Sequence, residues 1–339
     1  MASSSAVATQ QATGAGALDR LLAVTHGDME RVNALILKRA ESHVDMVPQL
    51  ARYLIEAGGK RLRPMLTVAA AQLFGKGSGA EVNYAAAVEF MHNATLLHDD
   101  VVDESDLRRG RPAARMIWGN QASVLVGDFL LGQAFMMMVE AGDINALGVL
   151  SKAATIIAEG EVFQLAKARD LDTTADEYSQ VIHAKTATLF AAAAEVGAMA
   201  GGADAAGREA LRVYGEELGL AFQLVDDVLD YRGEAGTLGK NTGDDLREGK
   251  MTLPVILALA DANPAEREII AAALGKDETP DGVMAQVVAI FNRHRSLDRT
   301  VEKADEHVRK ARAALETLPV SDMRTLLSDI ADFYVGRAY

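Results

Sequence analysis

The chain has 339 residues, of which 49% are hydrophobic and only 5% aromatic, so it is long enough to bury a large core. It contains no cysteine, which excludes disulfides, thiolate chemistry and cysteine-ligated metal centres. Its formal net charge of −14 at pH 7 argues against nucleic acid as a partner. An anionic ligand would therefore have to be bound through metal ions or local clusters of Lys and Arg.

Residues 1–17 are mostly Ala, Ser, Gln, Thr and Gly without a charged side chain, so we expect a disordered tail. From Leu18 onward apolar residues recur at helical spacing, and no segment alternates as a β-strand does. Helices are predicted over 21–39, 44–57, 65–74, 82–102, 120–141, 144–169, 175–200 and 205–232, with shorter helices from 264 to about 334. No linker interrupts this series, so we predict one all-α domain over residues 18–339. No apolar stretch is expected to span a membrane.

A basic turn, Gly59-Lys60-Arg61-Leu62-Arg63-Pro64, separates the second and third predicted helices. Free backbone N–H groups at the start of a helix favour an anion. Lys60 and Arg63 are therefore candidates for binding a negatively charged group.

The helix predicted over 82–102 runs into the aspartate triplet Asp99-Asp100-Val101-Val102-Asp103. The first and last aspartates project from one face, where stacked like charges destabilise a helix unless a cation lies between them. His92 lies two turns earlier on that face, and Arg108 and Arg109 follow in the next connector. In a chain with 48 acidic residues, one such triplet is as compatible with a solvated helix face as with a metal site.

The same pattern returns in the helix predicted over 205–232 as Asp226-Asp227-Val228-Leu229-Asp230, with Gln223 one turn earlier. Two triplets, each within an apolar helix and near basic residues, favour a functional site over two solvated faces. Carboxylates without cysteine or clustered histidine suit Mg²⁺, which is commonly shared with the phosphates of a substrate. We therefore predict that the two triplets hold a diphosphate between them through metal ions.

Further candidates gain weight only from their proximity to the triplets: Lys185 and Thr186 between two apolar stretches, and Lys240 and Lys250 around a Gly-rich loop. Metal ions that bind a diphosphate leaving group stabilise the charge that develops as its carbon–oxygen bond breaks. The carbocation so formed needs a dry, apolar cavity. No Ser-His-Asp arrangement or reactive cysteine points to a covalent enzyme intermediate.

On these residues the chain resembles the trans-isoprenyl diphosphate synthases, most closely the long-chain polyprenyl diphosphate synthases that make quinone side chains. The resemblance covers roughly residues 20–339 and rests on six motifs in the family's order. They are Gly59–Pro64, His92–Asp103 with Arg108-Arg109-Gly110, Lys185-Thr186, Phe222–Asp230, Gly239-Lys240 and Gly249-Lys250.

The resemblance implies an antiparallel helical bundle around a deep central cavity, in a cytoplasmic homodimer that contacts a membrane transiently to release product. It implies that isopentenyl diphosphate adds head-to-tail to an allylic diphosphate, farnesyl or geranylgeranyl, with loss of a proton. Roughly three Mg²⁺ ions would bind with the diphosphate. The implied metal ligands are Asp99, Asp103 and Asp226, with Asp100 and Asp230 beside them; with Lys185, the first three are the expected catalytic residues. Isopentenyl diphosphate would be held by Lys60, Arg63, His92 and Arg109, and the allylic diphosphate by Arg108, Lys185, Thr186, Gln223, Lys240 and Lys250.

Product length, in this family, depends on the residues four and five positions before the first triplet, where a bulky aromatic blocks the tunnel of short-chain enzymes. Here these residues are the small Thr95 and Ala94. Met91 and Met136 are candidates for lining deeper tunnel, although ordinary core packing accounts for a single methionine equally well. The resemblance implies a product of roughly eight to ten isoprene units.

Two alternatives remain open at this level, and a third fails. A class I terpene cyclase also uses an Asp-rich helix and magnesium, but it does not need a second diphosphate site. A non-catalytic partner subunit of a heteromeric prenyl synthase usually lacks one triplet, and both are intact here. A di-iron bundle would match Glu89-x-x-His92, but it requires a second such motif, which the sequence lacks.

Overall fold

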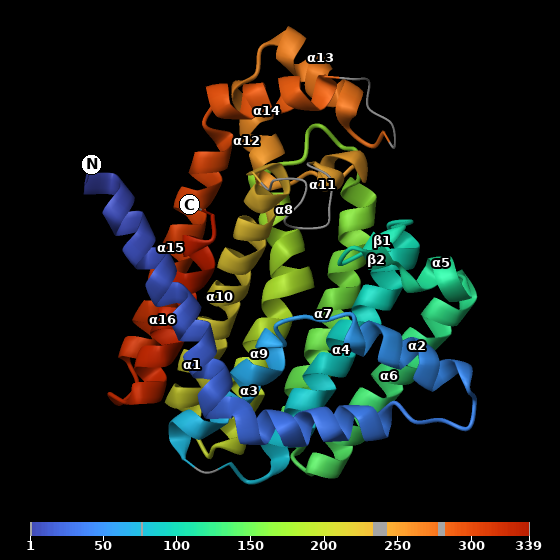
Figure 1. Cartoon of the computed structure of the whole chain (residues 1–339), viewed down its shortest axis with the longest axis vertical. Coiled ribbons are helices and arrows are strands. Elements are labelled where there is room, and N and C mark those ends of the chain that lie inside the picture. The colour runs from blue at the N-terminus through green and yellow to red at the C-terminus, as the bar shows by residue number, and fades with distance from the viewer. Residues whose placement is uncertain (1, 76, 233–242, 277–281, 339) are drawn as a thin grey trace.

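The computed structural model describes residues 2–75, 77–232, 243–276 and 282–338, and the side chains from residue 16 onward. Its helices are α1 (Ala2–Arg39), α2 (Met46–Glu56), α3 (Leu62–Phe74), α4 (Ala80–Val102), α5 (Ala114–Trp118), α6 (Asn120–Ala141), α7 (Ile144–Lys167), α8 (Ala175–Ile182), the π-helical turn η1 (His183–Ala187), α9 (Thr188–Ala200), α10 (Ala205–Arg232), α11 (Asp244–Arg247), α12 (Leu253–Asp261), α13 (Pro264–Ala273), α14 (Val283–Arg293), α15 (Ser296–Glu316) and α16 (Asp322–Gly336). Long helices run side by side, and α12, α13 and α14 lie across one end of the bundle (Figure 1). The all-α prediction is confirmed.

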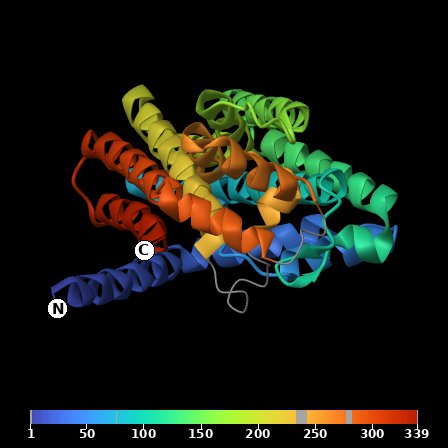
Figure 2. The same cartoon turned by 90° about the horizontal axis from the view of Figure 1, so that it is seen from above.

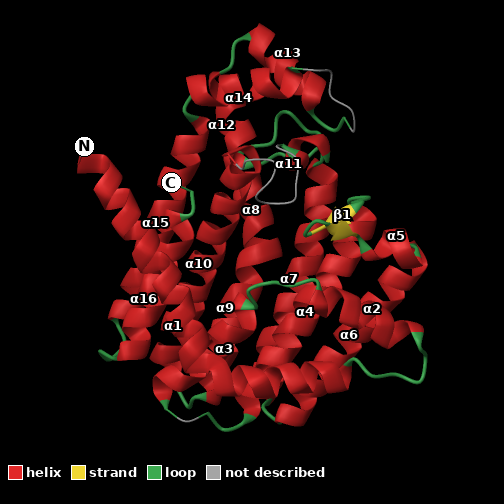
Figure 3. Cartoon of the chain, in the orientation of Figure 1, coloured by secondary structure: helices red, strands yellow, loops and turns green. Residues whose placement is uncertain are grey.

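Three local details differ from the predictions. Helix α1 begins at Ala2 rather than near Leu18, since its first residues include alanines and no proline; its first buried side chain is Ala17. The helix expected over 175–200 is divided by the π-helical turn η1. The connector after the first triplet forms a short hairpin, in which β1 (Leu107–Arg108) pairs antiparallel with β2 (Arg111–Pro112) (Figure 3).

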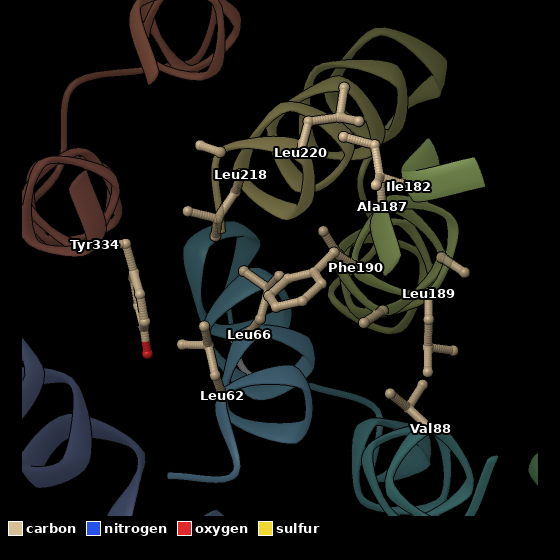
Figure 4. Packing of buried hydrophobic residues seen from close by; sticks show 14 of the residues in the cluster. Leu62, Leu66, Val88, Ile182, Ala187, Leu189, Phe190, Leu218, Leu220 and Tyr334 are labelled. Atoms are coloured by element: carbon tan, nitrogen blue, oxygen red, sulfur yellow. The ribbon is translucent and has the colours of Figure 1, made fainter. Parts of the chain in front are cut away.

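Small residues allow the central helices to approach closely. Helix α9 is rich in alanine and is buried along most of its length between α3 and α10. A Cβ atom at Gly215 of α10 would lie 2.4 Å from the carbonyl oxygen of Phe190 in α9, so only glycine fits this crossing. Phe190 itself lies among Leu62, Leu66 and Leu218 (Figure 4), and the Phe222 ring connects it to Tyr334 of α16.

Helix α6 has the length and composition of a membrane-spanning helix, with 22 residues and a mean hydropathy of 1.7, contrary to the sequence prediction. One face of α6 is buried against α4, and it includes Leu130, Met137 and Met138. The other face exposes large apolar side chains, among them Leu125 at 66% and Val139 at 63%. The apolar composition of α6 therefore arises from two faces, one buried against α4 and one exposed in the single chain.

Candidate active site

The first triplet lies where α4 ends, and its middle aspartate is fully buried. Arg108 of β1 donates a hydrogen bond of 2.8 Å from Nε to Asp100 Oδ1. Burial raises the pKa of Asp100, and the Arg108 guanidinium opposes that shift. Arg108, expected to bind substrate, is thus the ion-pair partner of Asp100, and the hairpin that carries it is fixed to the end of α4.

The outer two aspartates of this triplet each face a lysine. Lys185 Nζ of η1 lies 3.5 Å from Asp99 Oδ2, and Lys250 Nζ lies 3.0 Å from Asp103 Oδ2. Burial works to raise the pKa of Asp103, but Lys250 and Lys185 together hold it below its usual value. Each outer carboxylate of the first triplet is therefore already paired with a protein cation.

The second triplet is anchored through its middle aspartate, as the first one is. Asp227 of α10 is 1% exposed and accepts hydrogen bonds from the Tyr178 hydroxyl and from Gln223 Nε2, the latter at 2.9 Å. Thr186 Oγ1 donates to Gln223 Oε1 at 2.8 Å, which links η1 to α10. Asp226 is exposed, while burial raises the pKa of Asp227 well above its usual value.

The two triplets are connected through Lys250 and Asp245. Lys250, which contacts Asp103, also lies 3.9 Å from Asp245 Oδ1, and the Asp245 backbone N–H donates to Asp230 Oδ2 at 3.3 Å. From the side, α12–α14 lie above the main bundle (Figure 1), and the view from above shows them crossing over it (Figure 2). Residues far apart in the sequence thus form a single acidic surface.

A basic cluster lies beside this acidic surface. Arg63 Nη1 lies 3.3 Å from His92 Nε2, and its guanidinium stacks 4.4 Å from the centre of the Phe190 ring. Arg109, at positive φ in the β1–β2 turn, packs its guanidinium against Gly59, so close that a Cβ there would lie 2.9 Å from Nη1. Lys60 Nζ lies 5.2 Å from the Phe333 ring centre. The four residues predicted to bind one diphosphate come from three segments and gather here.

Burial and the neighbouring guanidinium groups shift the pKa values of the side chains in this cluster. Burial, followed by Arg63 and Arg109, lowers the pKa of His92 well below its usual value, so His92 is neutral near pH 7. Burial also lowers the pKa of Arg63 to about 10. Glu89 is buried among these guanidinium groups. The excess of positive charge favours a dianionic or trianionic ligand.

An apolar cavity of about 240 Å³ opens next to Asp99, between α4, α6 and α7. Its lining residues are Met91, Ala94, Thr95, His98, Asp99, Val102, Leu131, Ala154, Ile157, Ala158 and Glu161. Met91, Ala94 and Thr95, the candidates for product length, thus line this cavity. Met136 does not: it is 50% exposed on the outer face of α6, because helical periodicity turns it away from α4.

Several residues of this site were not found from the sequence. Glu161 of α7 belongs to no recognisable sequence motif. In the structure it accepts a hydrogen bond of 2.8 Å from Lys185 and lines the cavity. Tyr178 lies two turns before Lys185, and this spacing could have indicated it. Asp245 could not be found, since only tertiary packing brings it to Lys250. Lys240 lies outside the described residues.

The donor set fits a hard divalent cation. The side chains available at the cleft are carboxylates, and Asp100 Oδ2 and Glu161 Oε1 are buried without a hydrogen-bond partner in the described part of the chain. Within that same part, no three acidic or histidine side chains already enclose a point where an ion could sit. Mg²⁺ typically takes one or two carboxylates together with water and substrate phosphate, so an open arrangement of this kind is compatible with it.

Comparison with known proteins supports this interpretation of the cleft. Residues 44–291 match the family model described as polyprenyl synthetase. The chain is 45% identical to the octaprenyl diphosphate synthase of Escherichia coli, over 94% of this chain and 99% of that enzyme. A solved polyprenyl synthase from Caulobacter crescentus, complexed with calcium and isoprenyl diphosphate, superposes with a TM-score of 0.91 at 51% identity, covering 95% and 98% of the two chains. A decaprenyl diphosphate synthase structure from Rhodobacter capsulatus gives a TM-score of 0.90 at 49% identity, covering 95% and 99%.

The network below the second triplet generates a stability prediction. Tyr178→Phe removes a hydrogen bond to a buried carboxyl group, so we expect unfolding free energy to fall by about 1–3 kcal/mol in a urea titration. Tyr53→Phe is the matched control, because the Tyr53 hydroxyl donates to the Pro112 carbonyl at an exposed position; its expected effect is below about 0.5 kcal/mol. Equal losses in the two variants would contradict the anchoring role of Tyr178.

Proposed function

The chain belongs to the polyprenyl synthetase family and is a trans-prenyltransferase, and from this premise we propose that it condenses isopentenyl diphosphate onto an allylic diphosphate with the help of Mg²⁺. The observation that carries the proposal is that Lys250 and Asp245 link the two aspartate triplets, while Asp99 of the first triplet lines an apolar cavity. The first allylic substrate is proposed to be farnesyl or geranylgeranyl diphosphate.

The acidic surface would receive the allylic diphosphate. Asp99, Asp103 and Asp226 are the proposed metal ligands, with Asp100 and Asp230 beside them, and Mg²⁺ bound there would act as a Lewis acid on the leaving diphosphate. Lys185 and Lys250 already lie against the first triplet, within reach of phosphate oxygens at the same place. Thr186 and Gln223 connect Lys185 to the second triplet and fix its orientation. Arg108 would act indirectly, by holding Asp100.

The basic cluster of Lys60, Arg63, His92 and Arg109 would bind the diphosphate of isopentenyl diphosphate. Neutral His92 would donate one hydrogen bond, while the cations supply the charge. In the reaction the allylic carbon–oxygen bond breaks, and pyrophosphate departs with the bonding electrons. The isopentenyl double bond then forms the new carbon–carbon bond, and a proton is lost to the released pyrophosphate. The side chains of Met91 and Ala94 keep water from the carbocation.

The cavity would receive the growing hydrocarbon chain. Ala94 and Thr95 are small and form its wall next to the first triplet, so they leave the entrance open. The relatives include octaprenyl and decaprenyl diphosphate synthases, which support a product of roughly eight to ten isoprene units, suited to a quinone side chain.

The exposed apolar face of α6 and α7 would form the interface of a homodimer. It contains Leu125 and Val139 of α6 and Val162 and Leu165 of α7, each more than 60% exposed in the single chain. A second copy would remove this surface from water. We propose a cytoplasmic dimer that contacts a membrane only to release its hydrophobic product.

The function is tested by incubating the protein with farnesyl diphosphate, isopentenyl diphosphate and Mg²⁺. We expect isopentenyl diphosphate to be consumed, and EDTA to abolish its consumption. Asp99→Asn should reduce kcat by at least about a hundredfold, because it removes charge from the metal-binding surface. A hydrocarbon formed from farnesyl diphosphate alone would instead support a terpene cyclase, and an inert protein would support a partner subunit.

Product length is tested with Ala94→Phe. The phenyl ring would fill the cavity just below the first triplet, so we expect the main product to shorten to about three or four isoprene units, measured by mass spectrometry. Ala206→Phe, the same change at an exposed position of α10, should leave product length unchanged. An unaltered product from Ala94→Phe would show that the hydrocarbon does not pass this wall.

The dimer is tested by analytical ultracentrifugation of Leu125→Asp/Val139→Asp. We expect the wild type to sediment as a dimer and the double variant as a folded monomer, because two carboxylates would be buried in the interface. Val320→Asp, at an 83% exposed position between α15 and α16, should remain a dimer. A monomeric wild type would contradict the proposed interface.

A further inference from the structure

Each of the two lysines at the first triplet has a second carboxylate partner that does not belong to either triplet. Lys185 Nζ lies 2.8 Å from Glu161 Oε2, closer than its 3.5 Å contact with Asp99. Lys250 Nζ lies 2.5 Å from Glu248 Oε2, closer than its 3.0 Å contact with Asp103. The same arrangement thus occurs twice, with a glutamate as the nearer partner in both cases.

This arrangement creates a competition for the two aspartates. Asp99 and Asp103 are the carboxylates proposed to bind metal, and each already has an ammonium group within 4 Å. All four side chains are at most 24% exposed, so water screens them weakly. An arriving divalent cation must displace the ammonium groups, and each lysine then needs another counter-ion if it is to stay at the cleft.

We propose that Glu161 and Glu248 are positioning residues that retain Lys185 and Lys250 at the cleft when metal takes Asp99 and Asp103. The inference rests on the proposed function. Each lysine exchanges its aspartate for the incoming diphosphate while it keeps its glutamate. In the resting site the lysines neutralise the first triplet, and in the loaded site they bind the leaving group.

Three features favour this role for the glutamates. They come from segments separate from the triplets, Glu161 from α7 and Glu248 from the turn after α11, so metal binding at α4 need not move them. Glu161 Oε1 has no hydrogen-bond partner among the described residues, so Glu161 can follow Lys185 through a small displacement. The other groups that face Lys250 and Lys185 are Asp245 and the neighbouring lysine, and the repulsion between the two ammonium groups favours a carboxylate held beside each of them.

The experiment measures binding of Mn²⁺ alone by electron paramagnetic resonance. Lys250→Met removes the competitor for Asp103, so we expect Mn²⁺ to bind about tenfold more tightly than to the wild type, although turnover is lost. Glu248→Gln leaves Lys250 dependent on Asp103, so Mn²⁺ should bind several-fold more weakly. A structural role would weaken Mn²⁺ binding in both variants, whereas exchange predicts opposite signs.

The control is Glu104→Gln, which removes a negative charge next to Asp103; among the described residues, Glu104 forms no ion pair with either lysine. In the Lys250→Met background, Glu248→Gln should weaken Mn²⁺ binding no more than Glu104→Gln does, because Glu248 acts through Lys250. Lys250→Arg keeps the positive charge, so it should bind Mn²⁺ as weakly as the wild type does. This result would show that the tighter binding of Lys250→Met comes from the lost charge and not from misfolding. The corresponding cycle for Glu161 uses Lys185→Met and Lys185→Arg.

Two results would overturn the exchange: unchanged or weaker Mn²⁺ binding by folded Lys250→Met, or an equal effect of Glu248→Gln in both backgrounds. Failure of the proposed function is a separate outcome, because it appears as a wild type that consumes no isopentenyl diphosphate. An active wild type with additive variants would refute the exchange alone.

Discussion

Two helix ends rich in aspartate lie close together in the candidate active site. The carboxylates of each triplet repel one another unless cations lie between them. In this chain the requirement is met by protein groups: Arg108 at Asp100, Lys185 at Asp99 and Lys250 at Asp103. The fold around the cleft follows from this need, since the β1–β2 hairpin, η1 and the turn after α11 each deliver one of the three cations. Each carboxylate of the first triplet therefore has a protein cation beside it before any ligand arrives.

The middle aspartates have a different physical role from the outer ones. Asp100 and Asp227 are nearly fully buried, and each is held by hydrogen bonds from another segment. These bonds fix the ends of α4 and α10 and leave the neighbouring carboxylates to face the cleft. The repeated Asp-Asp-x-x-Asp sequence therefore combines one buried anchoring group with two carboxylates that are more exposed.

The apolar cavity depends on small side chains for its form. Alanines and glycines allow α9 to pack tightly between α3 and α10, while Ala94, Ala154 and Ala158 leave open space between α4, α6 and α7. Small residues thus allow helices to pack closely around α9, and they leave a cavity between α4, α6 and α7. Which outcome occurs depends on what lies opposite each residue, because alanine adds little volume of its own.

The sequence by itself determined the helical architecture, the two triplets and most of the cationic residues, because helical periodicity and charge spacing are local properties. It also identified Ala94 and Thr95 as wall residues, through a resemblance in motif order. Only the tertiary structure decided that Glu161 and Glu248 form ion pairs with the lysines, that the Tyr178 hydroxyl donates a hydrogen bond to Asp227, and that Met136 faces outward. These contacts join segments far apart in the chain, and their geometry is set by how the helices cross, which a linear pattern does not encode.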